Sequence, residues 1–278
     1  YALLLREAER EGAGSRLIRD GAAGAASLRL MVSGSMALPT PVLQKWRALT
    51  GHTLLERYGM TELGMALSNP LDGERVIGSV GRPLPGVECE LRDPSTGAPL
   101  DAEGSAQGGE LLVRGPGVFK EYFRRPEATA KAFADGGWFR TGDHASRDAE
   151  GIYRILGRAS VDVIKSAGYK ISALEVERAL LAHESVEEVA VVGIESEAFG
   201  QLVGAIVVPA SIGIGAGAAA SEASDACENA EALLARLRAD CADELAAYKL
   251  PTAIRVVSEI KKNPMGKVNK KALVDLFM

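Results

Sequence analysis

The stretch LRLMVSGSMALPTPVLQKWRALTGHTLLERYGMTE, from Leu28 to Glu62, decides the fold. Residues 28–35 form an apolar run stopped by small residues, which predicts a buried strand. Residues 39–50 carry apolar side chains at helical spacing and end before Gly51, and residues 53–58 predict a second strand. Strand, helix and strand joined by short loops predict a parallel α/β sheet with a site at the strand ends.

The sequence pattern changes twice after this stretch. From about residue 78, short strands at 87–92, 109–113 and 152–156 alternate with Gly, Pro and Asp turns, as in a small β-rich subdomain. Later, Ser172-Ala-Leu-Glu175 is a capping-box pattern that predicts the start of a helix. Strands at 186–194, 202–208 and 252–258, with a helix running to Ala247, would complete an α+β unit. We therefore expect two domains, residues 1–157 and 158–278.

Residues 210–230 are rich in Ala, Ser and Gly, which predicts a mobile insertion in the second domain. Within them, the glycines of Gly213-Ile-Gly215-Ala-Gly217 follow a strand and precede a helix, as in a dinucleotide-binding loop. No second strand ending in an acidic residue follows at the right distance. A linker is therefore the favoured interpretation.

Composition excludes several classes of function. The chain has 278 residues and a formal net charge of −5, and it lacks a basic run with interleaved aromatics, so nucleic-acid binding is not expected. Its three cysteines are widely separated, which argues against a disulfide framework and fits a reducing compartment. The histidines form no zinc spacing with them. The longest uncharged stretch is too weakly apolar for a membrane span, and the chain opens without a basic and apolar leader.

The segment Glu56-Arg57-Tyr58-Gly59-Met60-Thr61-Glu62 carries the first chemical signal. An aromatic ring, a glycine turn, a hydroxyl and a carboxylate suit a nucleotide with its magnesium ion. The alternative is a helix N-cap, with Thr61 as the cap and Glu62 near the positive helix end.

Three further fragments follow in order. Thr141-Gly142-Asp143 places a carboxylate after a glycine, where it can accept hydrogen bonds from ribose hydroxyls; an ordinary turn aspartate is the alternative. Gly157-Arg158 leads through Asp162 and Lys165 to Gly168-Tyr169-Lys170, and Met265-Gly266-Lys267 lies near the C-terminus. Each fragment is weak alone, whereas their order and separations are specific.

Together these motifs resemble the adenylate-forming superfamily, which includes acyl-CoA synthetases, luciferases and peptide-synthetase adenylation domains. The resemblance covers about residues 28–273, apart from the insertion. It implies that residues 1–157 are the C-terminal portion of the large AMP-binding domain. Residues 158–278 would be the small, mobile lid domain. The implied activity is an acid–thiol ligase that uses ATP, Mg²⁺ and coenzyme A, with no nucleic-acid partner.

The resemblance also implies a role for each motif residue. The residues that would line the adenine and acyl pocket are Ser33, Gly34, Ser35, Tyr58, Gly59 and Met60. Thr61 would contact the α-phosphate, Glu62 would hold magnesium, and Asp143 and Arg158 would bind the ribose. Lys267 would be the catalytic lysine, because two anions must meet during adenylation and a placed cation offsets their repulsion.

The segment after Arg158 is a hinge in the resembled superfamily. Rotation about it would remove Lys267 after adenylation and present Gly168, Tyr169 and Lys170 to the thiol substrate. Ala159 or Ser160 would be the pivot, where the commoner pattern has Asp or Lys. The identity of the pivot residue is therefore open.

Several stretches resemble malonyl-CoA synthetases in particular: residues 56–62 followed by Asn69-Pro70, residues 78–86 and residues 160–177. This likeness implies that Arg57 binds the distal carboxylate of malonate or methylmalonate, since guanidinium pairs with carboxylate through two parallel hydrogen bonds. Pairing of Arg57 with a surface acid is the alternative. Another short or medium-chain acid also stays open as the substrate.

The superfamily needs a Ser/Thr/Gly-rich loop ending in lysine around the β- and γ-phosphates of ATP. The sequence contains no such loop, so the resemblance implies a further N-terminal half, without which this piece would be inactive. A truncated, non-catalytic nucleotide- or CoA-binding fragment is the competing hypothesis. A mitochondrial and a cytoplasmic location are both open.

Overall fold

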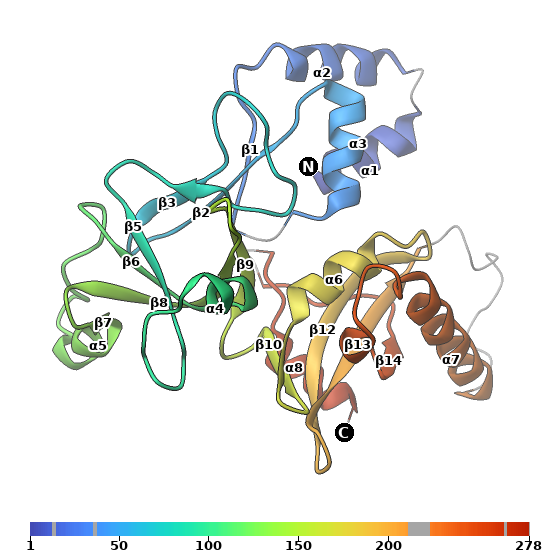
Figure 1. The fold of residues 1–278 in the computed structure, drawn as a ribbon. Coiled ribbons are helices and arrows are strands. Elements are labelled where there is room, and N and C mark those ends of the chain that lie inside the picture. Colours follow the sequence, from blue (N-terminus) through green and yellow to red (C-terminus); the bar gives the residue numbers. More distant parts are fainter. Residues whose placement is uncertain (13–14, 36–37, 211–222, 264–265, 278) are drawn as a thin grey trace. The chain divides into compact units, whose positions relative to one another are not determined.

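The computed structural model describes residues 1–12, 15–35, 38–210, 223–263 and 266–277. They form two compact units, Tyr1–Ile155 and Leu156–Met278 (Figure 1). The sequence had placed this division after residue 157. None of the helices in the described ranges is long and apolar enough to cross a membrane.

Unit 1 begins with three helices, α1 (Ala2–Glu11), α2 (Arg16–Ala26) and α3 (Thr40–Thr50). Leu43 and Trp46 of α3 pack with Leu5 of α1 in a small buried cluster, as their helical spacing predicts. Helix α3 ends at Gly51, whose left-handed backbone (φ 77°) lets its N–H donate to the carbonyl of Arg47.

The first sheet has the order β1-β2-β3-β4, with strands Val32–Ser33, Leu55–Met60, Gly64–Ser68 and Arg82–Pro83. Strands β1 and β2 are parallel, as expected from the β1–α3–β2 order, and β3 and β4 add antiparallel pairs. The strand expected over residues 28–35 is wrong in extent, because only Val32 and Ser33 pair with a neighbour among its described residues.

The second sheet confirms the β-rich subdomain expected after residue 78. It contains β5 (Glu88–Arg92), β6 (Gly109–Arg114), β7 (Phe133–Ala134), β8 (Trp138–Arg147) and β9 (Tyr153–Arg158), with helices α4 (Ala102–Gln107) and α5 (Pro126–Ala132) between strands. A core around Leu67, Leu111 and Phe139 joins this sheet to strand β3. The first sheet is thereby fixed against the second.

Unit 2 is built on a sheet of β10 (Val163–Ser166), β11 (Tyr169–Ser172), β12 (Val186–Ser196), β13 (Gly200–Pro209) and β14 (Ala253–Val256). Alternate residues of β12 and β13 enter two different cores. Helices α6 (Ala173–Leu181) and α7 (Ala223–Asp240) cover one core, and α8 (Lys270–Val274) with the turn Asp275–Phe277 covers the other (Figure 1). Both faces of the sheet are therefore buried.

Three local predictions in unit 2 need correction. The capping box of α6 is half formed: Ser172 Oγ accepts from Glu175 N, but the Glu175 carboxylate binds Lys249 instead of returning to Ser172. Helix α7 ends at Asp240 rather than Ala247, and a short 3₁₀ turn spans Ala247–Lys249. Helix α7 also begins at Ala223, inside the expected insertion, while residues 211–222, with the Gly213–Gly217 pattern, lie outside the described residues.

Candidate functional site

Two predicted site residues of unit 1 meet directly. The hydroxyl of Tyr58, on β2, donates a 2.6 Å hydrogen bond to Asp143 Oδ2, on β8, although 85 positions separate them in sequence. Asp143 is almost fully buried and is not a turn aspartate. Gly142 (φ 72°) lies where the β6–β8 pairing is irregular and helps turn the following carboxylate toward Tyr58.

Thr61 and Glu62 lie in the turn between β2 and β3, so the helix N-cap alternative is wrong. The Glu62 carboxylate accepts a 3.0 Å hydrogen bond from the Tyr122 hydroxyl, and its backbone carbonyl accepts one from Phe119 N. The Thr61 side chain is exposed. This turn therefore presents a hydroxyl beside a carboxylate whose orientation is fixed by an aromatic neighbour.

Gly59 is required by the close approach of two backbones. A Cβ at position 59 would lie 2.1 Å from the carbonyl oxygen of Gly64 on β3, which no side chain can tolerate. Tyr58 and Met60, on either side, pack against the unit 1 core. Gly59 thus lets the hairpin close while its neighbours are held in place.

Ser33, Gly34 and Arg57 lie together at the β1–β2 pair. Ser33 stands opposite Glu56 in the parallel register, and a Cβ on Gly34 would lie 3.2 Å from the Arg57 carbonyl oxygen and 3.4 Å from its Nη1. Gly34 therefore leaves room for the arginine. Ser35, which follows, is exposed and has a left-handed backbone (φ 70°).

The Arg57 guanidinium has no acid partner within the described ranges. Its Nη1 lies 2.7 Å from the Met65 sulfur, a weak acceptor, and no ion pair with a described carboxylate involves it. The alternative that Arg57 pairs with a surface acid is not seen there. Arg57 is half-buried as a residue, but its guanidinium contact with Met65 is exposed, so the guanidinium is accessible to an anion.

In unit 2, Arg158 lies at the start of a tight turn. Its backbone N–H donates to Asp162 Oδ2 at 2.9 Å, and Asp162 N donates back to the Arg158 carbonyl at 2.8 Å. A Cβ on Gly157 would lie 2.3 Å from Asp162 Cβ, so glycine is needed before the turn. The Arg158 side chain is exposed.

The predicted thiol-site residues Gly168, Tyr169 and Lys170 lie at the β10–β11 hairpin. Gly168 has a left-handed backbone (φ 85°), and Tyr169 and Lys170 are exposed on β11. The Tyr169 ring stacks on Tyr248 with centroids 4.2 Å apart. The hairpin therefore offers an exposed aromatic face beside a cation.

Lys267 closes a turn that begins at Asn263. Its backbone N–H donates to Asn263 Oδ1 at 2.9 Å, and Asn263 N donates to the Lys267 carbonyl at 2.9 Å. Gly266 (φ 77°) provides the reversal between them, and the Lys267 side chain is exposed. Met265, quoted with the motif, lies outside the described residues.

No group of three or more His, Cys, Asp or Glu side chains that could hold a metal occurs among the described residues. Magnesium does not need one, because it binds in nucleotide sites through one or two carboxylates together with substrate phosphates. The single carboxylate of Glu62, oriented by Tyr122, fits that requirement.

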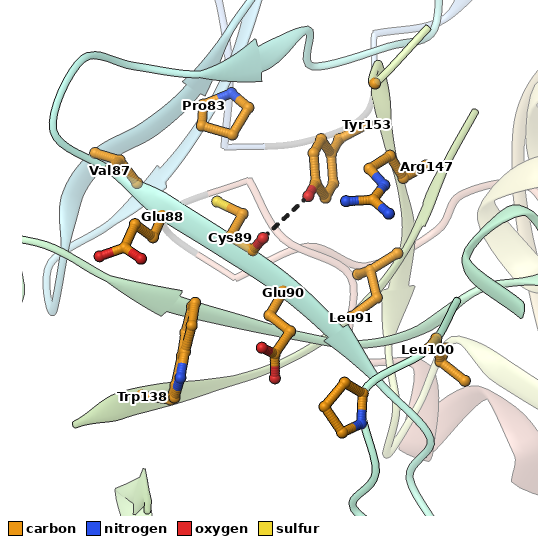
Figure 2. A pocket seen from close by; sticks show the side chains of 12 residues that line it. Pro83, Val87, Glu88, Cys89, Glu90, Leu91, Leu100, Trp138, Arg147 and Tyr153 are labelled. Carbon is orange, nitrogen blue, oxygen red and sulfur yellow. Dashed lines mark hydrogen bonds between the residues drawn. The ribbon is translucent and has the colours of Figure 1, made fainter. Parts of the chain in front are cut away.

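Figure 2 shows a hollow of unit 1 that contains none of the predicted site residues. Cys89 and Tyr153 are among its lining residues, and the Tyr153 hydroxyl donates a 3.3 Å hydrogen bond to the Cys89 carbonyl. Burial raises the pKa of the Cys89 thiol to about 12, so this thiol is not a nucleophile at neutral pH.

Two models of AMP-binding enzymes match the chain. The model described as AMP-binding enzyme matches residues 3–123, and that described as AMP-binding enzyme C-terminal domain matches residues 175–267. The chain belongs to the AMP-binding enzyme family. One match lies in unit 1 and the other in unit 2 of this family member.

Several relatives of this AMP-binding chain are named as ligases that join a small acid to CoA. The mitochondrial malonate–CoA ligase of Mus musculus is 51% identical over 263 residues, covering 89% of this chain and 42% of its own length. Sulfoacetate–CoA ligase of Cupriavidus necator is 37% identical over 252 residues, with coverages of 90% and 45%. The crystal structure of ATP-bound MatB from Rhodopseudomonas palustris matches with a TM-score of 0.74 and 38% identity, covering 90% of this chain and 45% of that one. The chain therefore spans less than half the length of these relatives.

Sequence reasoning missed several residues that hold the site. Tyr122 orients Glu62, and Asn263 closes the Lys267 turn. Asn69, quoted above for the likeness to malonyl-CoA synthetases but given no role there, ties the loop before β4 to β2. Their types gave no signal, because a tyrosine or an asparagine in a loop is usually an ordinary surface residue. Only the folded chain brings each one to its partner.

Proposed function

We propose that the complete protein is an ATP-dependent acid–thiol ligase that activates malonate as its adenylate and transfers the malonyl group to coenzyme A. The family membership and the acid–CoA ligases among its relatives support this reaction class. The malonate–CoA ligase of Mus musculus, at 51% identity, supports the choice of acid and favours the mitochondrion among the two compartments.

The observation that carries the substrate proposal is Arg57. Malonate keeps a second carboxylate after activation, and that anion is best bound by a cation placed beside it. Arg57, beside Gly34 and without a described acid partner, supplies one. A fatty or aromatic acid would need an apolar lining there instead.

The other residues of unit 1 bind the nucleotide in this proposal. Tyr58 lies against the adenine, its hydroxyl fixed by Asp143, and Asp143 binds the ribose. Thr61 contacts the α-phosphate. Glu62 would hold a magnesium ion, which supplies positive charge on the phosphate oxygens.

The residues of unit 2 act on both half-reactions. In the first, a malonate carboxylate oxygen bonds to the α-phosphorus while the bond to pyrophosphate breaks, and Lys267 offsets the accumulated negative charge. In the second, the CoA sulfur bonds to the acyl carbon as AMP leaves with the electrons of the C–O bond and the thiol proton is released. Arg158 binds the ribose, and residues 168–170 contact the thiol substrate.

The test uses the chain joined to its upstream half, with AMP release measured for malonate, methylmalonate, sulfoacetate and acetate in the presence of CoA. Arg57→Ala should lower kcat/KM for malonate by about 100-fold or more, because a desolvated ion pair is lost, and change acetate by less than about threefold. The control Arg16→Ala removes an exposed arginine of α2 and should change neither.

An equal loss for malonate and acetate in Arg57→Ala would remove the reason for naming a diacid. A preference for sulfoacetate would favour the second candidate, a ligase for a sulfonated acid, since a sulfonate also needs a cation and one relative uses that acid. Absence of AMP release with every acid would leave the non-catalytic fragment as the better hypothesis.

A further inference from the structure

Lys270 is an unusual residue of unit 2, since it is a largely buried lysine three positions after Lys267. Its ammonium lies 2.5 Å from Asp162 Oδ1 and 2.7 Å from Glu177 Oε1, and all three side chains are 11–14% exposed. Burial opposes its charge, yet the two carboxylates outweigh that effect and raise the pKa of Lys270. It is therefore a cation held between two acids.

The three partners come from three different segments. Lys270 opens helix α8 after the Lys267 turn, Glu177 lies on α6, and Asp162 closes the Arg158 turn. One ammonium thus joins the segment that carries the proposed catalytic lysine to the segment that carries the proposed ribose-binding arginine.

The two acids are bonded differently. Asp162 uses separate oxygens, with Oδ1 on Lys270 and Oδ2 on the N–H of Arg158. Glu177 uses one oxygen, Oε1, for both Lys270 and the N–H of Val191. An amide with a single carbonyl oxygen could therefore replace Glu177 and keep both contacts, but could not do so at Asp162.

We propose that Lys270 is a positioning residue for adenylation: by bridging Asp162 and Glu177 it keeps the Lys267 turn and the Arg158 turn at a fixed spacing within unit 2. The proposal rests on the adenylation role given to Lys267 above. A lysine misplaced by about 1 Å loses much of its effect on the developing charge, whereas the thioester step does not use it.

The test compares Asp162→Asn with its matched control Glu177→Gln in the complete enzyme. Asp162→Asn keeps an acceptor for Arg158 N but turns an amide NH₂ toward the ammonium, so malonate-dependent pyrophosphate–ATP exchange should fall about 10- to 100-fold. Transfer from pre-made malonyl-adenylate to CoA should change less than about threefold. Glu177→Gln should change neither rate by more than about threefold.

Amide hydrogen exchange supplies a readout that does not depend on activity. Asp162→Asn should speed exchange in residues 266–274, and Glu177→Gln should leave it unchanged. Equal loss of both half-reactions in Asp162→Asn, or unchanged exchange protection, would overturn the positioning role. If the unmodified enzyme makes no adenylate from any acid, the proposed function fails, while faster amide exchange in Asp162→Asn would still support the bridge.

Discussion

At the scale of single residues, the site of unit 1 depends on pairs that no local pattern predicts. Tyr58 with Asp143 and Glu62 with Tyr122 each join positions 60 or more apart. In each pair a phenol donates to a carboxylate, which fixes the acid's orientation without neutralising its charge. The residues proposed to bind the nucleotide are therefore held in place before any ligand arrives.

The reactivity of Cys89, a partly buried residue of strand β5, tests how far the second sheet shields its side chains from water. Its pKa is raised by burial from the usual value of 9.0 to about 12, so iodoacetamide should modify it at pH 8 about 1,000-fold more slowly in the folded protein than in urea. Mass spectrometry of the Cys89 peptide follows the reaction.

The same shift sets a pH dependence of stability. The pKa of Cys89 is higher in the folded than in the unfolded protein. Its contribution to the free energy of unfolding is therefore fully present below about pH 9 and is lost as the pH rises toward about 12. Equal rates of Cys89 modification in the folded and unfolded protein would contradict the effect of its partial burial on the thiol pKa.

At the scale of elements, the hairpin of β2 and β3 carries most of the unit 1 motif. The order of strand β1, helix α3 and strand β2 could be predicted, because the spacing of apolar residues and the position of Gly51 indicate each element locally. The pairing of β2 with β3 could not be predicted, because strand β3 and the turn at Thr61 depend on the close approach of the Gly59 and Gly64 backbones. The same limit applies to Glu175. The sequence predicts it as a capping partner of Ser172, but in the fold its carboxylate binds Lys249, which is distant in sequence.

Gly59→Ala tests this close approach. The new methyl would lie 2.1 Å from the Gly64 carbonyl, so the hairpin must open and the free energy of unfolding should fall by about 3 kcal/mol. Urea denaturation of the complete enzyme measures it. Gly24→Ala on helix α2, where a Cβ meets nothing within 4 Å, is the control and should be neutral or stabilising by about 0.5–1 kcal/mol. A Gly59→Ala protein as stable as its parent would show that the hairpin is not this tight.

At the scale of the whole molecule, the motif order in the sequence predicted the family and the α/β class, both of which are now established. Burial and partners could not be predicted. Lys270 looks like any lysine of a basic C-terminal run, and only the meeting of α6, α8 and the Arg158 turn buries it between two acids. The proposed catalytic residues could be identified from motifs in the sequence, whereas the residues proposed to position them could be identified only from the fold.

The central claim for the molecule is that it makes an acyl-adenylate with Lys267 and then a thioester without it. The most direct measurement is of both half-reactions in the complete enzyme carrying Lys267→Ala. Malonate-dependent pyrophosphate–ATP exchange should fall by about 100-fold or more, because the cation at the developing charge is gone. Transfer of the malonyl group from pre-made adenylate to CoA should stay within about threefold of the unmodified rate. Loss of both half-reactions together, or of neither, would contradict the account.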